Sequence, residues 1–217
     1  MEDSLFKKYK LIEDTLIPYG FIKKDNSYVY CKNILDDSFR VEVTISDNVS
    51  VKVIDLEFNV EYTNYRRKND NGEFVGKVRG NIIDILKDIR DKCFTREFFI
   101  YPQSNRITKL IEEKYNDIPE FLWEDNNAGV FRNKKNKKWY AIIMNVNQNK
   151  LDKNSNNDVE VMNVKLDPEV INKLIDNQVY YRAYHMNKKY WMSIILNNTK
   201  DDKEIMDLIN TSYKFTE

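Results

Sequence analysis

The chain has 217 residues, of which 41% are hydrophobic and 13% aromatic, with 35 basic and 35 acidic side chains. This composition excludes a disordered chain and provides enough apolar residues for one large domain or two small ones. The zero net charge gives the molecule no general attraction for polyanions, and no apolar run approaches the roughly 20 residues of a membrane span.

Residues 1–95 predict a unit with the order helix, antiparallel sheet, helix. Apolar residues at helical spacing predict a first helix over residues 5–16, which Pro18 and Gly20 end. A second helix is predicted from Val78 to about Cys93 by the same spacing. Alternating apolar residues predict an antiparallel meander with strands at residues 28–31, 39–45, 49–53 and 58–62.

Residues 96–217 predict a larger domain with the order α-β-β-β-α-β-β-α. Asp167 followed by Pro168 is typical of a helix start, and Asp201 or Asp202 is expected to cap the last helix. The predicted fold class is α+β, an antiparallel sheet with helices on one face. Its elements are a helix near residues 107–115, a hairpin of strands 130–131 and 139–146, a strand at 159–165, a helix after Asp167, a hairpin of strands 180–184 and 190–196, and a last helix.

Two of these strands are apolar on both faces, which an antiparallel sheet with one helical layer does not need. We therefore expect the second face of the sheet to be covered, either by the N-terminal unit, which is preferred, or by a partner chain. Simple alternation along residues 139–146 assigns the faces as follows: Trp139, Ala141 and Ile143 on one, and Tyr140, Ile142 and Met144 on the other.

Metal or cofactor chemistry has few candidate ligands in this chain. Cys31 and Cys93 are far apart, and His185 is the only histidine. This set is too small for a structural zinc site, so no metal and no cofactor are expected. The N-terminal residues lack the pattern of a signal peptide, and the expected location is the cytoplasm.

Three stretches of the C-terminal half resemble the MmcQ/YjbR family. They are NKKWYAII at residues 136–143, YHMNKKYW at 184–191 and DLINTSY at 207–213, with VKLDP at 164–168 between the first two. The N-terminal unit looks like the extra region of longer, MmcQ-type members. The resemblance implies a CyaY-like fold for residues 96–217, with a "double wing" of two β-hairpins proposed to bind DNA.

Both hairpins carry basic side chains that fit this implied function. Lysines at a hairpin tip suit contacts with phosphates, which give affinity without base-sequence discrimination. The local charge agrees, because residues 126–217 carry 15 basic and 11 acidic groups, or +4, whereas residues 1–95 carry 16 and 17, or −1. The candidate DNA-binding residues are Arg132, Lys134, Lys135, Lys137 and Lys138 in the first hairpin, and Arg182, His185, Asn187, Lys188 and Lys189 in the second.

The expected partner is double-stranded DNA, and the expected state is a monomer or a weak homodimer. Lysine-rich tips are also typical of solvated turns, and Trp139 and Trp191 fit core positions better than base stacking. One alternative is a protein-interaction module without nucleic-acid binding. Another is a small-ligand binder or enzyme with a cleft near His185, lined by Lys188 and Trp191. No catalytic constellation is recognisable, so an enzyme is not expected.

Overall fold

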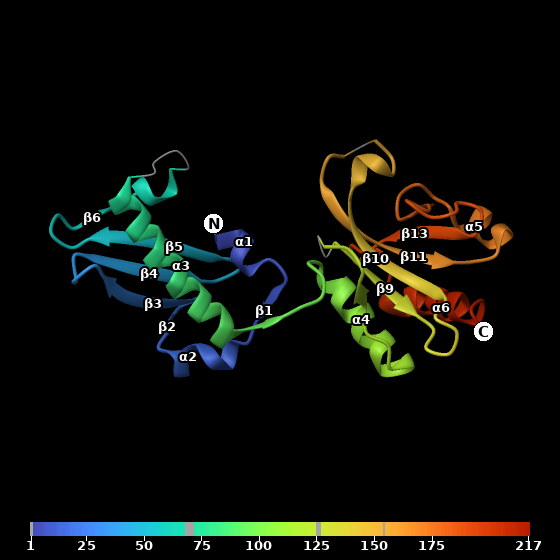
Figure 1. Cartoon of the computed structure of the whole chain (residues 1–217), viewed down its shortest axis with the longest axis horizontal. Helices are drawn as coiled ribbons and strands as arrows, with labels where there is room; N and C mark the ends of the chain where they lie inside the picture. The colour runs from blue at the N-terminus through green and yellow to red at the C-terminus, as the bar shows by residue number, and fades with distance from the viewer. Residues whose placement is uncertain (1, 68–71, 125–126, 154) are drawn as a thin grey trace. The chain divides into compact units, whose positions relative to one another are not determined.

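The computed structural model describes residues 2–67, 72–124, 127–153 and 155–217. The chain divides into two compact units, residues 1–97 and 98–217. Each unit has its own antiparallel sheet and its own hydrophobic core (Figure 1). Within the described ranges, no helix is both long and apolar enough to cross a membrane.

The N-terminal unit is a five-stranded antiparallel sheet covered on one face by a long helix. Its elements are α1 (Glu2–Phe6), β1 (Tyr9–Leu11), η1 (Glu13–Thr15), α2 (Leu16–Tyr19), β2 (Ile22–Lys24), β3 (Ser27–Ile34), β4 (Phe39–Ile45), β5 (Val49–Asp55), β6 (Val60–Glu61), η2 (Asn64–Arg66), α3 (Glu73–Cys93) and β7 (Phe94–Arg96). The sheet has the strand order β2-β3-β4-β5-β6, and α3 crosses its face (Figure 1). Alternate residues of β4 are buried against α3, as the sequence pattern predicts.

The predicted single helix over residues 5–16 is wrong. The first helix ends at Phe6, and Lys8 has a left-handed backbone with φ of 68°. Residues 9–11 then form β1, which pairs antiparallel with β7. Backbone pairing with a segment about 85 residues away therefore overrides the local helical spacing. The strand predicted at residues 58–62 is also shorter, because only Val60–Glu61 pairs with β5.

The C-terminal unit is a six-stranded antiparallel sheet with three helices on one face. Its elements are α4 (Pro102–Tyr115), β8 (Glu120–Phe121), β9 (Ala128–Arg132), β10 (Trp139–Asn147), η3 (Gln148–Lys150), β11 (Asp158–Lys165), α5 (Pro168–Leu174), β12 (Tyr180–Arg182), β13 (Trp191–Ile195) and α6 (Asp202–Lys214). The strand order is β12-β13-β11-β10-β9-β8. Ile107 of α4, Ile171 of α5 and Ile209 of α6 all belong to one core, which confirms helices on one face.

Helix capping in this unit follows the sequence signals. The Asp167 carboxylate accepts a hydrogen bond from the backbone N–H of Glu169 at 2.8 Å, and Pro168 is the first residue of α5. Asp201, rather than Asp202, caps α6 by accepting from the N–H of Glu204 at 2.7 Å. Both predicted helix starts are therefore confirmed, because a short carboxylate before the first turn pairs an otherwise unpaired N–H.

The second face of this sheet has a smaller apolar cluster of its own. Its buried members include Ile142, Val161 and Ile195, one from each of three neighbouring strands. Leu151, Tyr184 and other side chains from loops of the same unit pack against them. The expectation that the N-terminal unit or a partner chain must provide the cover is therefore corrected: loops of the C-terminal unit provide part of it.

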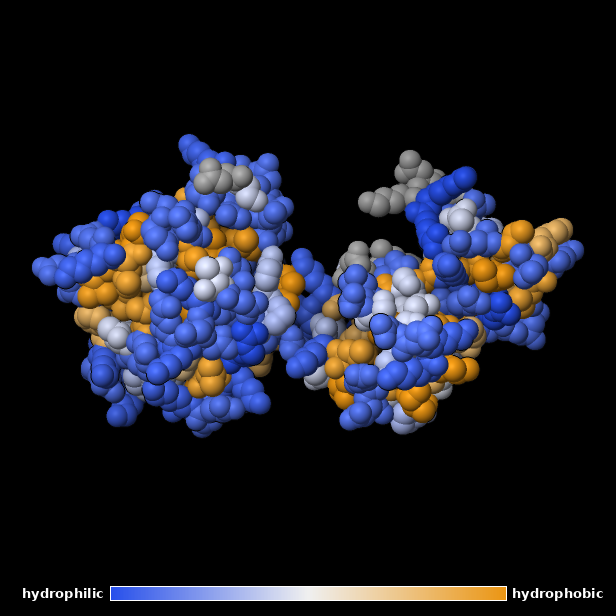
Figure 2. All heavy atoms as spheres, turned by 180° about the vertical axis from the view of Figure 1, so that it is seen from behind, coloured by the Kyte–Doolittle hydropathy of each residue, from blue (hydrophilic) through white to orange (hydrophobic). Residues whose placement is uncertain are grey.

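Figure 2, which views the chain from behind, shows mainly hydrophilic side chains with apolar patches between them.

Candidate nucleic-acid interface

A β-bulge at the start of β10 determines which aromatic side chain faces outward. The register between β9 and β10 shifts between Trp139 and Ala141, so one extra residue enters the strand. As a result Tyr140 points into the main core, and Trp139 lies with Ile142 on the second face. The assignment of faces by simple alternation is therefore wrong at Trp139 and Tyr140. The Trp139 side chain, which was expected in the core, is half-buried at the surface instead.

Trp139 lies in an aromatic groove of about 520 Å³ on the second face of the sheet. Trp139 and Trp123 meet edge to face with ring centroids 6.3 Å apart, and the Arg132 guanidinium lies 5.4 Å from the Trp139 ring. Trp123 is 46% exposed. We call this hollow the Trp groove; its lining residues are Trp123, Asn127, Ala128, Trp139, Ile142, Met144, Asn145, Val146, Asn147, Lys150, Tyr184, His185 and Met186.

The connection between β12 and β13 folds over the second face instead of standing free at the sheet edge. The Tyr184 backbone N–H donates to the Ser193 hydroxyl, and the Tyr184 carbonyl accepts from the Asn163 amide, each at 3.0 Å. Asn163 and Ser193 pair across β11 and β13, and strand alternation places both on the second face. The following residue, His185, has a left-handed backbone with φ of 58°. This loop therefore forms a wall of the Trp groove.

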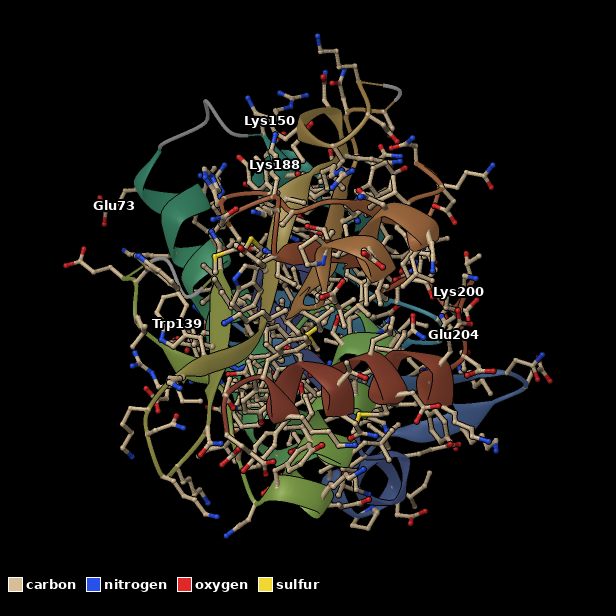
Figure 3. The ribbon with its side chains drawn as sticks, turned by 90° about the vertical axis from the view of Figure 1, so that its right-hand side faces the viewer. Glu73, Trp139, Lys150, Lys188, Lys200 and Glu204 are labelled. Carbon is tan, nitrogen blue, oxygen red and sulfur yellow. The ribbon has the colours of Figure 1, made fainter. Side chains whose placement is uncertain are left out.

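A second hollow, of about 390 Å³, adjoins the Trp groove and is lined by cationic side chains. Lys150, Arg182 and Lys188 contribute to its wall, together with His185. We call it the cationic hollow. Lys150, Tyr184 and His185 also line the Trp groove, so the two hollows share a boundary. Figure 3 shows Lys150 and Lys188 close together at one end of the unit, away from Trp139.

One anchored tyrosine fixes the loop that carries Lys150. The Tyr181 hydroxyl donates to the Asp152 carboxylate at 2.8 Å, and burial, then this hydrogen bond, raises the pKa of Tyr181 to about 12. The hydroxyl consequently remains a proton donor at neutral pH. It ties β12 to the connection that follows β10, which holds Lys150 near the loop containing Lys188.

The tip of the first hairpin is tied to the C-terminal residues. The Asn133 amide donates to the Thr216 hydroxyl at 3.2 Å, and the Asn136 amide donates to the Thr216 carbonyl. Asn133 is 1% exposed, and its side-chain oxygen accepts from the backbone N–H of Lys135 at 2.9 Å. These bonds give the tip a defined shape, with Lys137 in a left-handed conformation at φ of 62°.

Two of the five basic residues predicted in this hairpin are paired with carboxylates. Arg132 lies 3.0 Å from Glu120, and the Lys134 ammonium lies 3.7 Å from the buried Asp117. The other three are exposed and form no ion pair with any described residue: Lys135, Lys137 and Lys138. These three remain available for an anionic partner.

The five candidates of the second hairpin have several different surroundings. Lys188, His185 and Arg182 line the cationic hollow, and Arg182 also donates to the Asn172 side chain. Lys189 lies 5.2 Å from the ring of Tyr190, and the Asn187 side chain accepts from the Lys189 backbone N–H. Trp191, which was predicted to line a cleft near His185, is only 8% exposed. The hollow beside His185 is lined by Trp139 and Trp123 instead.

One relative and one solved structure each match about half of this chain. The uncharacterized protein YyaQ of Bacillus subtilis (strain 168) is 37% identical over 111 residues, which are 51% of this chain and 94% of that protein. A family model described as YjbR matches residues 112–215. This chain belongs to the YjbR family. The resemblance seen in the sequence is thereby confirmed.

Solved structures also match part of the chain. A crystal structure of a Pseudomonas syringae protein is 34% identical, has a TM-score of 0.50, and matches over 52% of this chain and 97% of that chain. A crystal structure of a Deinococcus radiodurans protein with a DUF419 domain is 22% identical, with a TM-score of 0.41 over 52% of this chain and 76% of that chain. The YjbR match thus lies within the unit that carries the Trp groove.

Several residues of the YjbR unit's surface were missed by reasoning from the sequence. Trp123 and Lys150 both line the Trp groove, although neither belongs to the basic hairpins. Trp123 and Lys150 lie in connections whose positions depend on tertiary contacts. Trp139 was assigned to the core, because nothing in the local pattern indicates the bulge. Among the described residues, no group of three or more acidic, histidine or cysteine side chains is placed to hold a metal ion.

Proposed function

We propose that the C-terminal unit binds DNA through contacts to phosphates, without base-sequence preference. The observation that carries this proposal is the tip of the first hairpin, where Lys135, Lys137 and Lys138 are exposed and unpaired among the described residues. A flexible ammonium on a hairpin tip binds a phosphate as a point charge, which gives affinity but little discrimination between bases. Lys150 and Lys188 add a second basic site on the same unit.

The surroundings of these lysines favour an anionic partner over a bare solvated turn. The bonds from Asn133 and Asn136 to Thr216 hold the tip in one shape, so less conformational entropy is lost on binding. The ion pairs of Arg132 and Lys134 help to hold the hairpin in place. The three exposed lysines take no part in these pairs. The zero net charge of the whole chain limits the expected affinity to moderate values at low salt.

Binding of labelled duplex DNA, measured by fluorescence anisotropy between about 50 and 200 mM salt, tests this proposal. Each neutralised phosphate contributes about 0.9 to the slope of log K against log salt. The triple variant Lys135→Gln, Lys137→Gln, Lys138→Gln should therefore lower that slope by about 2 to 3. Its matched control, with the same change of charge on the helical layer, is Lys109→Gln, Lys173→Gln, Lys203→Gln.

The control variant should bind DNA like the unaltered protein, because its three positions lie on α4, α5 and α6, on the opposite face of the sheet from the Trp groove. Equal losses in the two triple variants would show that net charge alone, and not the tip, controls binding. An absence of duplex and single-strand binding at the lowest salt concentration would remove the proposed function.

A further inference from the structure

We propose that the Trp groove holds an unpaired nucleobase while the cationic hollow holds an adjacent phosphate, so that this unit prefers single-stranded DNA. This inference rests on the proposed function and names the form of DNA that the unit recognises. Its basis is the contact between two hollows of different chemistry. One is lined by aromatic and apolar side chains, the other by three cations and a histidine, and they share Lys150, Tyr184 and His185.

The aromatic lining suits the flat face of a base. Trp123 and Trp139 meet at 81°, so the two indoles form a corner rather than a closed stack. Trp123 is 46% exposed and Trp139 is half-buried, which leaves ring surface open to the groove. The floor is apolar, because Ile142, Met144 and Val146 of β10 face this side. Stacking of bases on exposed aromatic rings is a common basis of single-strand binding.

The groove suits the face of a base rather than its edge. Ile142, Met144 and Val146 face the groove, so strand alternation directs the Asn145 side chain to the helical face of the sheet, with Ile143. The Asn147 side chain is used within the protein, since it accepts from the backbone N–H of Asn149 and donates to the Asn156 carbonyl. We therefore expect stacking on Trp123 and Trp139 to provide the contact with the base, without a preference for one base over another.

The charge of the adjoining hollow selects an anionic group beside the base. No carboxylate is among the described residues that line either hollow. Lys150 and Lys188 form no ion pair within the described parts of the chain, so their ammonium groups are available to a phosphate. An aromatic groove beside unpaired lysines complements a nucleotide better than a neutral aromatic molecule or an apolar helix of another protein.

The geometry disfavours a fully paired duplex. In double-stranded DNA the faces of the bases are stacked on their neighbours, and a base reaches a pocket only after it has left the stack. A single strand presents its bases without that cost. The groove volume of about 520 Å³ lies within the range of sites that enclose a small ligand, so one base with its sugar fits there.

Three labelled oligonucleotides of equal length test this proposal with the full chain: a base-bearing single strand, an abasic strand of the same sugar-phosphate backbone, and a duplex. The two single strands have equal charge, so only base contacts distinguish them. The base-bearing strand should bind about 5- to 150-fold more tightly than the abasic strand, the range that stacking of one base provides. It should also bind more tightly than the duplex and quench the fluorescence of Trp123 and Trp139.

Trp123→Ala should abolish the preference for the base-bearing strand and leave abasic binding unchanged, and Trp123→Phe should restore part of it. Phe74→Ala, which removes a similarly exposed aromatic (49%) from the N-terminal unit, is the control and should have no effect. Lys150→Gln with Lys188→Gln should weaken binding of both single strands. Lys173→Gln with Lys203→Gln is the matched control for this change of charge.

The outcomes separate this inference from the proposed function. Equal binding of the base-bearing and abasic strands, together with tight duplex binding, would overturn the inference and leave the proposed function intact. A lack of binding to all three oligonucleotides would overturn both. Binding of free deoxythymidine monophosphate without binding of any strand would show that the two hollows form a small-molecule site, which also overturns the inference.

Discussion

Removing the hydroxyl of Tyr140 should destabilise the C-terminal unit, although the ring stays buried. Tyr140 is fully buried, and its hydroxyl donates to the Asp117 carboxylate at 2.9 Å. Asp117 is itself 4% exposed, and its other described partner, the Lys134 ammonium, lies 3.7 Å away. Tyr140→Phe leaves the Asp117 carboxylate buried, with only the longer contact to the Lys134 ammonium. Burial, and then Asp117, raise the pKa of Tyr140 above its usual value, so the hydroxyl donates throughout the neutral range.

A hydrogen bond to a charged group contributes about 1.5 to 3 kcal/mol to stability. For a unit of this size, about 4 °C of melting temperature corresponds to each kcal/mol, so the expected loss is about 6 to 12 °C. All three tryptophans, Trp123, Trp139 and Trp191, lie in the C-terminal unit. Their intrinsic fluorescence during urea or thermal unfolding therefore reports on this unit without interference from the other.

The matched control is Tyr213→Phe. The Tyr213 ring stacks on Tyr115, with centroids 4.1 Å apart, but its hydroxyl has no hydrogen-bond partner among the described residues. The control should change stability by less than about 0.5 kcal/mol. The double variant Tyr140→Phe, Asp117→Asn should lose less unfolding free energy than the sum of the two single changes. The reason is that the double variant contains no buried carboxylate without its hydrogen-bond donor. Equal stability of Tyr140→Phe and the unaltered protein would refute the importance of this buried pair.

Three further predictions concern backbone geometry and acid sensitivity. Gly129→Ala should lower the free energy of unfolding by about 1 to 3 kcal/mol in urea titrations, because an added Cβ would lie 2.7 Å from the Phe99 ring. Lys137→Gly should raise that free energy by about 0.5 to 1 kcal/mol by relieving the left-handed backbone, and anisotropy should show the salt slope of DNA binding lowered by about 0.9. The hydrogen bond from Arg106, against the opposing effect of burial, lowers the pKa of Asp202, so this pair stabilises the fold above about pH 4 and the gain is lost as pH falls further. In melting curves, the Arg106→Gln variant should therefore lose less stability on acidification than the unaltered protein does. An equal loss in the two proteins would contradict the stabilising role of the Arg106–Asp202 pair.

The helical layer and most strands of this protein follow from local patterns in the sequence. Apolar alternation predicts β4, and helical spacing with the caps Asp167 and Asp201 predicts α5 and α6. The pattern fails where distant backbone pairing competes with it. Residues 9–11 have helical spacing, yet they pair with β7 because a strand partner is available there. That partner lies far away in sequence, so a local window does not contain the information.

The basic residues of the candidate site could be found from the sequence, whereas their grouping could not. Charge and turn signals place Lys135, Lys137 and Lys138 at a hairpin tip, where the structure also has them. Pairing of Lys134 with Asp117 depends on a contact between separate elements, which charge counts do not predict. Lys150 and Lys188 come from connections at different points of the chain and meet only because loops fold over the second face.

By itself, the sequence determined the fold class and the positions of the exposed cations, because periodicity and turn chemistry act over a few residues. The family came from the resemblance of three short motifs, which are also local. Only the tertiary structure decided which face each aromatic ring occupies. One inserted residue at the start of β10 reverses the positions of Trp139 and Tyr140, and the loop at Tyr184 crosses the sheet through bonds to Asn163 and Ser193. Both features depend on hydrogen bonds between strands, and these exist only once the sheet has formed.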